Sequence, residues 1–252
     1  MTDKKDVLIL ASGGGSNAEA IVSHAQKQEL PIRFVGGCNI SREKAGVYER
    51  LEKLNVPVHY LPSPKTDFSA LCGFLDKNRF DLIVLAGYMR VLPADIADNY
   101  RIVNIHPSIL PFVYKGSMDA YKDAMDNGDI YTGCTVHQVT SEVDAGPILA
   151  QIAFEIPPLV RKDGDLDTLK KIGLAHEHAL YPEVVASVVL SGKYILNAPI
   201  KMIRVADQAK KNLADRELPA VDKFIPLSYH RGFLEFNPKE VAWKKKILYC
   251  GR

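Results

Sequence analysis

Short apolar runs alternate with amphipathic segments along most of the chain. The runs predict strands at 7–12, 32–38, 56–61, 81–86, 102–105, 134–140 and 147–156. Helical spacing of apolar residues predicts helices at 18–28, 44–54, 68–78, 93–99, 117–126 and 166–191, with Pro182 as a candidate break in the last. This alternation predicts an α/β fold: a Rossmann-like, mostly parallel sheet with helices on both faces.

Three loops of this predicted sheet follow the carboxyl ends of strands. They are the glycine-rich loop at 13–17, the segment at 87–92 and the turn at Pro107. The carboxyl ends of parallel strands lie at one edge, where such folds bind ligands. We therefore expect the three loops to meet at a candidate active site.

The segment 101–111 carries the strongest candidate chemistry. Asn104 and His106 are two residues apart on a predicted strand, so their side chains should point to the same side. Pro107 prevents the strand from simply continuing. An amide and an imidazole can both donate hydrogen bonds to a carbonyl oxygen that acquires negative charge. From this segment alone, a structural role for His106 remains as open as a catalytic one.

The glycine-rich loop fits two kinds of ligand. Its pattern, glycine at 13 and 15 and alanine at 18, matches a loose form of the dinucleotide fingerprint. The second predicted strand, however, ends in the segment 37–40 without the carboxylate that would hold a ribose. We favour binding of one phosphate by backbone N–H groups and the Ser16 hydroxyl. A simple tight turn remains the alternative.

Composition is that of an ordinary globular protein. The 252 residues are 47% apolar and 25% charged, which fits one large domain or a domain of about 200 residues with an appendage. A net charge of +2 gives no case for broad nucleic-acid binding. No apolar run has transmembrane length and no signal-peptide core precedes the first strand, so we expect a cytoplasmic protein without membrane contact.

Cysteines and the remaining histidines add no metal site. The cysteines, at 38, 72, 134 and 250, have no metal-ligand spacing and are expected to be reduced thiols. His176 and His178 lie two apart on a predicted helix, so one ion could not easily reach both. We treat every histidine other than His106, including His137, as a structural or surface residue unless something pairs with it.

Four segments together resemble the formyltransferases that use 10-formyltetrahydrofolate. The segment 104–111 is similar to their N-x-H-x-S-L-L-P signature, and 133–147 to the segment that supplies a catalytic aspartate, here Asp144. The segment 85–92 resembles the stretch that binds the pteridine. The loop at 12–17 and Glu177 are similar to features of the branch that formylates glycinamide ribonucleotide in purine synthesis. The resemblance covers about 6–198 and implies a formyltransferase fold.

The resemblance also implies roles for individual residues. It implies catalysis by Asn104, His106 and Asp144, and ribonucleotide binding by Gly14, Gly15, Ser16, Asn17 and Glu177. It implies folate binding by Met89, Arg90, Val91, Leu92, Asn104, Thr140, Val143 and Asp144. The co-substrate would be 10-formyltetrahydrofolate, and no metal is expected.

The implied reaction is attack of the amine of glycinamide ribonucleotide on the formyl carbon. Asn104 and a protonated His106 would hold the oxyanion, and Asp144 would orient the ring and favour its charged form. Three alternatives stay open: methionyl-tRNA formyltransferase, formyltetrahydrofolate hydrolase, and a nucleotide- or folate-binding module without activity.

The chain departs from the family pattern at three places. Lys65 stands where the family often has an arginine and could replace it only as a point charge. The loop after Pro111 is one residue longer than usual, and Tyr121 falls where many members have a histidine near the aspartate. The segment 170–176 also diverges just before Glu177.

The resemblance ends near residue 198, which suggests a catalytic domain at 1–198 and an extension at 199–252. We expect a charged helix at 200–217, an aromatic, proline-bearing segment at 218–238 and a short strand at 241–249. The extension is expected to pack on the main domain or on a second subunit, so a homodimer is left open. A docking role for the basic segment 244–246 is the alternative.

Overall fold

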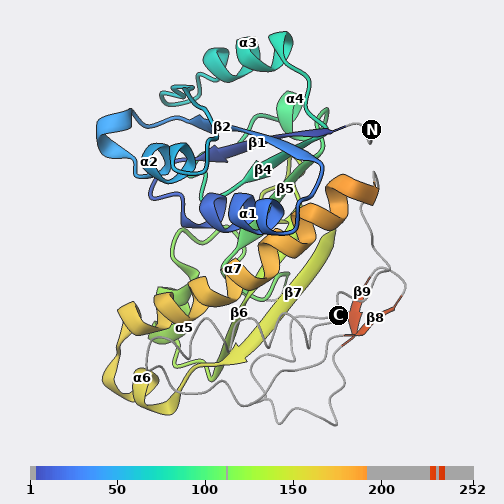
Figure 1. The fold of residues 1–252 in the computed structure, drawn as a ribbon. Coiled ribbons are helices and arrows are strands. Elements are labelled where there is room, and N and C mark those ends of the chain that lie inside the picture. The colour runs from blue at the N-terminus through green and yellow to red at the C-terminus, as the bar shows by residue number, and fades with distance from the viewer. Residues whose placement is uncertain (1–3, 112, 192–227, 231–232, 236–252) are drawn as a thin grey trace.

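A seven-stranded sheet organises the protein. The structure is a computed structural model that describes residues 4–111, 113–191, 228–230 and 233–235 (Figure 1). The strand order is β3-β2-β1-β4-β5-β6-β7. The bounds are β1 (Lys5–Ala11), β2 (Ile32–Cys38), β3 (Val58–Tyr60), β4 (Leu82–Leu85), β5 (Ile102–His106), β6 (Tyr131–Gln138) and β7 (Ile148–Glu155).

The pairing of these strands is mostly parallel, as predicted. Parallel ladders join β1 to β2 and β4, β2 to β3, and β4 to β5. The β5–β6 and β6–β7 ladders are antiparallel. Since β1, β4 and β5 are adjacent and parallel, their carboxyl ends and the loops that follow lie at one edge.

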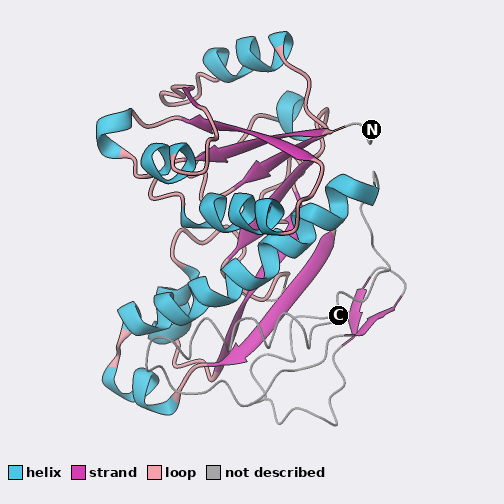
Figure 2. Cartoon of the chain, in the orientation of Figure 1, coloured by secondary structure: helices cyan, strands magenta, loops and turns pink. Residues whose placement is uncertain are grey.

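Helices flank the sheet on both faces (Figure 2). They are α1 (Ser16–Lys27), a 3-10 turn η1 (Arg42–Lys44), α2 (Val47–Glu52), α3 (Ser69–Lys77), α4 (Ala94–Ala97), α5 (Ala120–Asp126), α6 (Pro158–Asp163) and α7 (Leu166–Ser191). None of the helices in the described part of the chain is long and apolar enough to cross a membrane.

Alternate residues of β1 supply two separate hydrophobic cores. Val7 and Ile9 pack in the cluster that also contains buried residues of α1, α2 and α7. Leu8 and Leu10 pack in the cluster that contains buried residues of α3 and α4. Successive side chains of a strand point to opposite faces, so a strand apolar at every position requires cover on both sides. The predicted layer arrangement is confirmed.

Two predicted helices differ from the structure. The helix expected at 44–54 is divided into η1 and the shorter α2, because Gly46 approaches the glycine-rich loop: the Val47 N–H donates to the Gly13 carbonyl at 3.2 Å. The break expected in α7 is absent, and the helix continues through Pro182.

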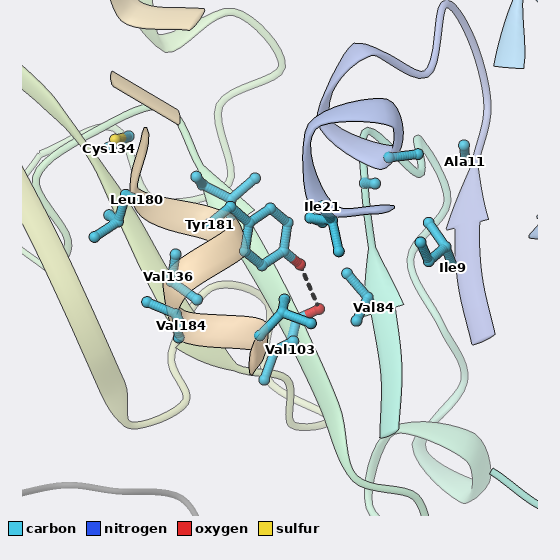
Figure 3. Packing of buried hydrophobic residues seen from close by; sticks show 14 of the residues in the cluster. Ile9, Ala11, Ile21, Val84, Val103, Cys134, Val136, Leu180, Tyr181 and Val184 are labelled. Atoms are coloured by element: carbon cyan, nitrogen blue, oxygen red, sulfur yellow. Dashed lines mark hydrogen bonds between the residues drawn. The ribbon is translucent and has the colours of Figure 1, made fainter. Parts of the chain in front are cut away.

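Packing explains why α7 tolerates an internal proline, which costs about 3 kcal/mol in a free helix. Tyr181 is fully buried, and its hydroxyl lies 3.0 Å from the carbonyl oxygen of Leu85. It lies 3.0 Å from the Val103 carbonyl oxygen as well (Figure 3). Val184 and Val185 are also buried in the same core. Burial of such side chains contributes about 1.5–3 kcal/mol each, so tertiary packing outweighs the local penalty.

Three elements were not predicted. Helix α6 begins with Pro158 and ends at Gly164, which has a left-handed φ of 66°, an arrangement typical of helix ends. An antiparallel pair of strands, β8 (Ser228–His230) and β9 (Phe233–Glu235), lies within the aromatic segment. The helix expected at 200–217 and the strand expected at 241–249 lie outside the described residues.

Candidate active site

The loops after β1 and β4 are hydrogen-bonded to each other. The Ser12 N–H donates to the Gly87 carbonyl at 3.0 Å, and the Met89 N–H donates to Ser12 Oγ at 2.8 Å. A pocket opens beside them at the carboxyl edge. Among the predicted site residues, its lining includes Asn17, Met89, Arg90, Val91, Leu92, Asn104, His106, Thr140, Val143, Asp144 and Glu177. The predicted convergence of the loops is confirmed; Gly14, Gly15 and Ser16 lie outside this lining.

Asp144 lies against His106. Its Oδ2 is 3.3 Å from His106 Nδ1, and the two side chains are only 11% and 6% exposed. The same oxygen accepts a hydrogen bond from the Gly116 N–H at 3.0 Å. Burial by itself would raise the pKa of Asp144, but hydrogen bonding from His137 and the charge of His106 bring it below its ordinary value. Asp144 is therefore ionised at neutral pH.

Burial and polar neighbours act in opposite directions on the pKa of His106. Burial lowers the pKa of His106 below its ordinary value, and the Asp144 carboxylate and the Tyr114 carbonyl only partly offset that effect. Its Nε2 lies 2.9 Å from the Tyr114 carbonyl oxygen, so both ring nitrogens face protein groups. The Nε2–H group can donate to a ligand only after its hydrogen bond to the Tyr114 carbonyl breaks.

His137 belongs to the same cluster, and it is therefore a histidine with a partner and not one of the structural or surface histidines expected from the sequence. Its Nε2 is 3.2 Å from Asn104 Nδ2 and 3.4 Å from Asp144 Oδ1, and its Nδ1 is 2.9 Å from the Gln138 carbonyl. The reason is register: Asn104 on β5 is directly opposite His137 on the antiparallel β6. The position of His137 in the Asp144 segment was a signal, but only strand pairing brings it to Asn104.

The glycine-rich loop provides an open approach to the start of α1. Gly15 has φ 77°, and a Cβ there would lie 2.6 Å from Val47 side-chain atoms, so the loop requires glycine at this position. Gly13 and Gly14 have open space where a Cβ would be. Free N–H groups at a helix start attract anions. This geometry suits a phosphate next to the pocket.

Glu177 of α7 connects that loop to the pocket. It is 8% exposed, and its Oε2 accepts a hydrogen bond from Asn17 Nδ2 at 2.7 Å. Its Oε1 accepts one from the Tyr121 hydroxyl at 3.2 Å. Asn17 Oδ1 is buried and has no hydrogen-bond partner. Burial raises the pKa of Glu177, although both hydrogen bonds oppose the rise.

Apolar side chains form the mouth of the pocket. Met89, Val91 and Val143 line it while 54%, 66% and 40% exposed. Met118 of the loop before α5 is 74% exposed and also lines the pocket, and it is not among the residues for which the resemblance implies a role. Exposed apolar residues gathered at one pocket indicate a site for an aromatic or apolar ligand.

Residues 5–185 match the family described as formyl transferase. The chain belongs to the formyl transferase family. The phosphoribosylglycinamide formyltransferase of Escherichia coli (strain K12) is 32% identical over 190 residues, which cover 72% of this chain and 85% of that protein. A solved structure of phosphoribosylglycinamide formyltransferase from Bacillus halodurans is 35% identical with a TM-score of 0.65, covering 73% of this chain and 95% of that one. The Rossmann-like fold is therefore confirmed.

Longer relatives contain a matching part. The trifunctional purine biosynthetic protein adenosine-3 of Chironomus tentans is 35% identical over 209 residues, which cover 77% of this chain. This formyl transferase spans only 14–20% of the length of such trifunctional relatives.

Two departures from the family pattern are now located. Tyr121, which falls where many members have a histidine near the aspartate, donates its hydroxyl hydrogen bond to Glu177. Lys65 is not among the residues that line the pocket.

Among the described residues, no group of three His, Cys, Asp or Glu side chains could hold a metal. His176 packs against Phe154 with ring centroids 4.2 Å apart, and burial lowers its pKa to about 4.

Proposed function

We propose that the protein transfers the formyl group of 10-formyltetrahydrofolate to the amine of glycinamide ribonucleotide, a step of purine synthesis. The observation that carries this proposal is one pocket that joins the His106–Asp144 pair, an apolar mouth, and the Asn17–Glu177 pair beside a phosphate-type loop. The name of the Escherichia coli relative, of which this chain covers 85%, supports the same activity.

The ligands fit the two ends of this pocket. The ribonucleotide phosphate binds the loop residues Gly14, Gly15 and Ser16, and its ribose lies beside Asn17 and Glu177. The folate lies against the apolar mouth, where Met89, Arg90, Val91, Leu92, Thr140 and Val143 line the pocket. This arrangement brings the amine and the formyl carbon together beside Asn104 and His106.

The chemistry requires stabilisation of a tetrahedral oxyanion. The amine nitrogen bonds to the formyl carbon, and the carbonyl electron pair moves to the oxygen, which accepts hydrogen bonds from the N–H groups of Asn104 and His106. The carbon–N10 bond then breaks, and the proton lost by the amine ends on N10 of tetrahydrofolate. Asp144 orients the His106 ring, and its negative charge favours the protonated ring while negative charge develops on the oxygen.

An acceptor assay tests the proposal. Purified full-length protein is mixed with 10-formyltetrahydrofolate and with glycinamide ribonucleotide, charged initiator tRNA or no acceptor. Only the ribonucleotide should accelerate release of tetrahydrofolate. Equal release without an acceptor would indicate a hydrolase, acceleration by tRNA would indicate the tRNA enzyme, and no release in any arm would indicate a binding module. Each of these three results contradicts the proposal.

The protein is proposed to act in the cytoplasm on these small molecules. Cys38, Cys72 and Cys134 are free thiols in the described part of the chain, which supports a reducing compartment. The homodimer and the division into a domain at 1–198 and an extension at 199–252 remain predictions. Sedimentation of the full chain measures the first of these directly.

A further inference from the structure

A glycine in the middle of α7 makes room for a tyrosine. Gly173 is at a helical position where alanine would be about 1 kcal/mol more favourable. A Cβ on Gly173 would lie 2.2 Å from Tyr121 Cζ and 2.3 Å from its hydroxyl oxygen. Real atoms do not approach this closely, so the ring of Tyr121 fits over α7 only because residue 173 has no side chain.

The Tyr121 ring is held firmly in this place. Tyr121 is 5% exposed on α5, and its ring centroid is 6.5 Å from that of Phe154. A second contact ties α5 to α7, because Lys170 Nζ lies 2.6 Å from Asp119 Oδ2 at the start of α5. The hydroxyl then donates to Glu177 Oε1 at 3.2 Å, one helical turn beyond Gly173.

The opposite side of Glu177 is fixed by Asn17. With Asn17 Nδ2 on Oε2 and the Tyr121 hydroxyl on Oε1, both carboxylate oxygens have donors and the plane of the carboxylate is set. Asn17 is 8% exposed and its Oδ1 has no partner, although the residue lines the pocket. A buried amide oxygen next to a carboxylate offers two acceptors side by side, which suits the two neighbouring hydroxyls of a ribose.

We propose that Tyr121 is a positioning residue for the ribonucleotide: seated over Gly173, its hydroxyl orients the Glu177 carboxylate toward a ribose hydroxyl while Asn17 Oδ1 accepts from the neighbouring one. The proposal rests on the proposed function of the pocket. It assigns to Tyr121 and Gly173 a part in choosing ribose over deoxyribose, and no contact with the reacting formyl group.

The first test is Tyr121→Phe, which removes the hydroxyl and keeps the ring. A hydrogen bond to a charged group is removed, so we expect KM for glycinamide ribonucleotide to rise about 10-fold while kcat and KM for the folate change less than about twofold. Tyr48→Phe is the matched control, because that buried tyrosine also loses one hydrogen bond, to the Ile40 carbonyl, away from Glu177. It should leave all three constants unchanged.

The acceptor itself provides a sharper readout. The 2′-deoxy and 3′-deoxy forms of the ribonucleotide are compared with the parent in the wild type and in Tyr121→Phe. The wild type should discriminate strongly against at least one deoxy form, and the variant should lose most of that discrimination. The acid limb of kcat/KM should also shift to higher pH in the variant, because the lost donor favours the ionised Glu177.

Gly173→Ala tests the same contact without changing the tyrosine. The added methyl must displace the Tyr121 ring, so KM for the ribonucleotide should rise as in Tyr121→Phe, and the two changes combined should not be additive. An unchanged KM in both variants, or a loss of kcat alone, would overturn the proposal. If the wild type does not formylate the ribonucleotide, the proposed function fails; if it does and the variants behave as wild type, only this inference fails.

Discussion

Replacing Asp144 with asparagine removes one charge from the centre of the site while preserving shape. The carboxylate lies 3.3 Å from His106 Nδ1, and both side chains are nearly buried. At this separation the attraction to a charged ring is about 1.3 kcal/mol in bulk water and about 5 kcal/mol at the effective dielectric constant of a protein site. Without this attraction, protonation of the His106 ring should therefore become about 10-fold to several thousand-fold less favourable.

Two measurements follow from this value. An NMR titration should show the pKa of His106, already lowered by burial, falling further in Asp144→Asn. Steady-state assays should show kcat reduced by about 10²–10³, the middle of the calculated range, with little change in KM for either substrate. A kcat within about twofold of the wild type, or a His106 pKa that stays the same or rises, would show that the Asp144 charge does not support a protonated His106.

Asp81→Asn provides the control. Asp81 is also a part-buried carboxylate with two partners, Lys5 Nζ at 3.0 Å and the Asp6 N–H at 2.8 Å, but it is at the start of β4, the edge opposite the pocket. Its loss should lower Tm slightly and leave kcat unchanged. A similar fall in kcat for both variants would assign the effect to general destabilisation.

Three further predictions concern other parts of the molecule. Asn104→Ala should lower kcat by about 10²–10³ with an unchanged Tm, because one oxyanion donor is lost; near-wild-type turnover would remove Asn104 from the mechanism. His176 has a pKa of about 4 when folded and about 6.5 when unfolded, so the unfolded chain binds more protons and stability should fall as pH drops through that window; urea unfolding of His176→Gln should show a shallower fall. Gly15→Ala should lower Tm and raise KM for the ribonucleotide, because φ 77° and the contact with Val47 exclude a side chain; an unchanged KM would separate the loop from substrate binding.

Much of the fold follows from local patterns in the sequence. Every residue of β1 from Val7 to Leu10 is apolar, which predicts a strand with a core on each side, and both cores are present. The ends of β1, β4 and β5 could be located from glycine and proline, so the meeting of three loops was predictable. Helix α6 was missed although Pro158 and Gly164 mark its two ends.

Long-range pairing limited the prediction of the site. His137 reaches Asn104 only through the register of β5 with β6, and Tyr121 reaches Glu177 only because α5 packs on α7 beside Gly173. Neither contact has a local pattern. The sequence also suggested Asp144 as a neighbour of His106, but the burial that lowers the pKa of His106 depends on the folded chain.

A single-turnover experiment measures formyl transfer itself. Full-length protein in excess is mixed with 10-formyltetrahydrofolate carrying an isotopically labelled formyl carbon and with glycinamide ribonucleotide. The label should appear quantitatively on the ribonucleotide amine, and Asn104→Ala should slow its appearance by about 10²–10³. Label recovered as free formate, or retained on the folate, would contradict the account.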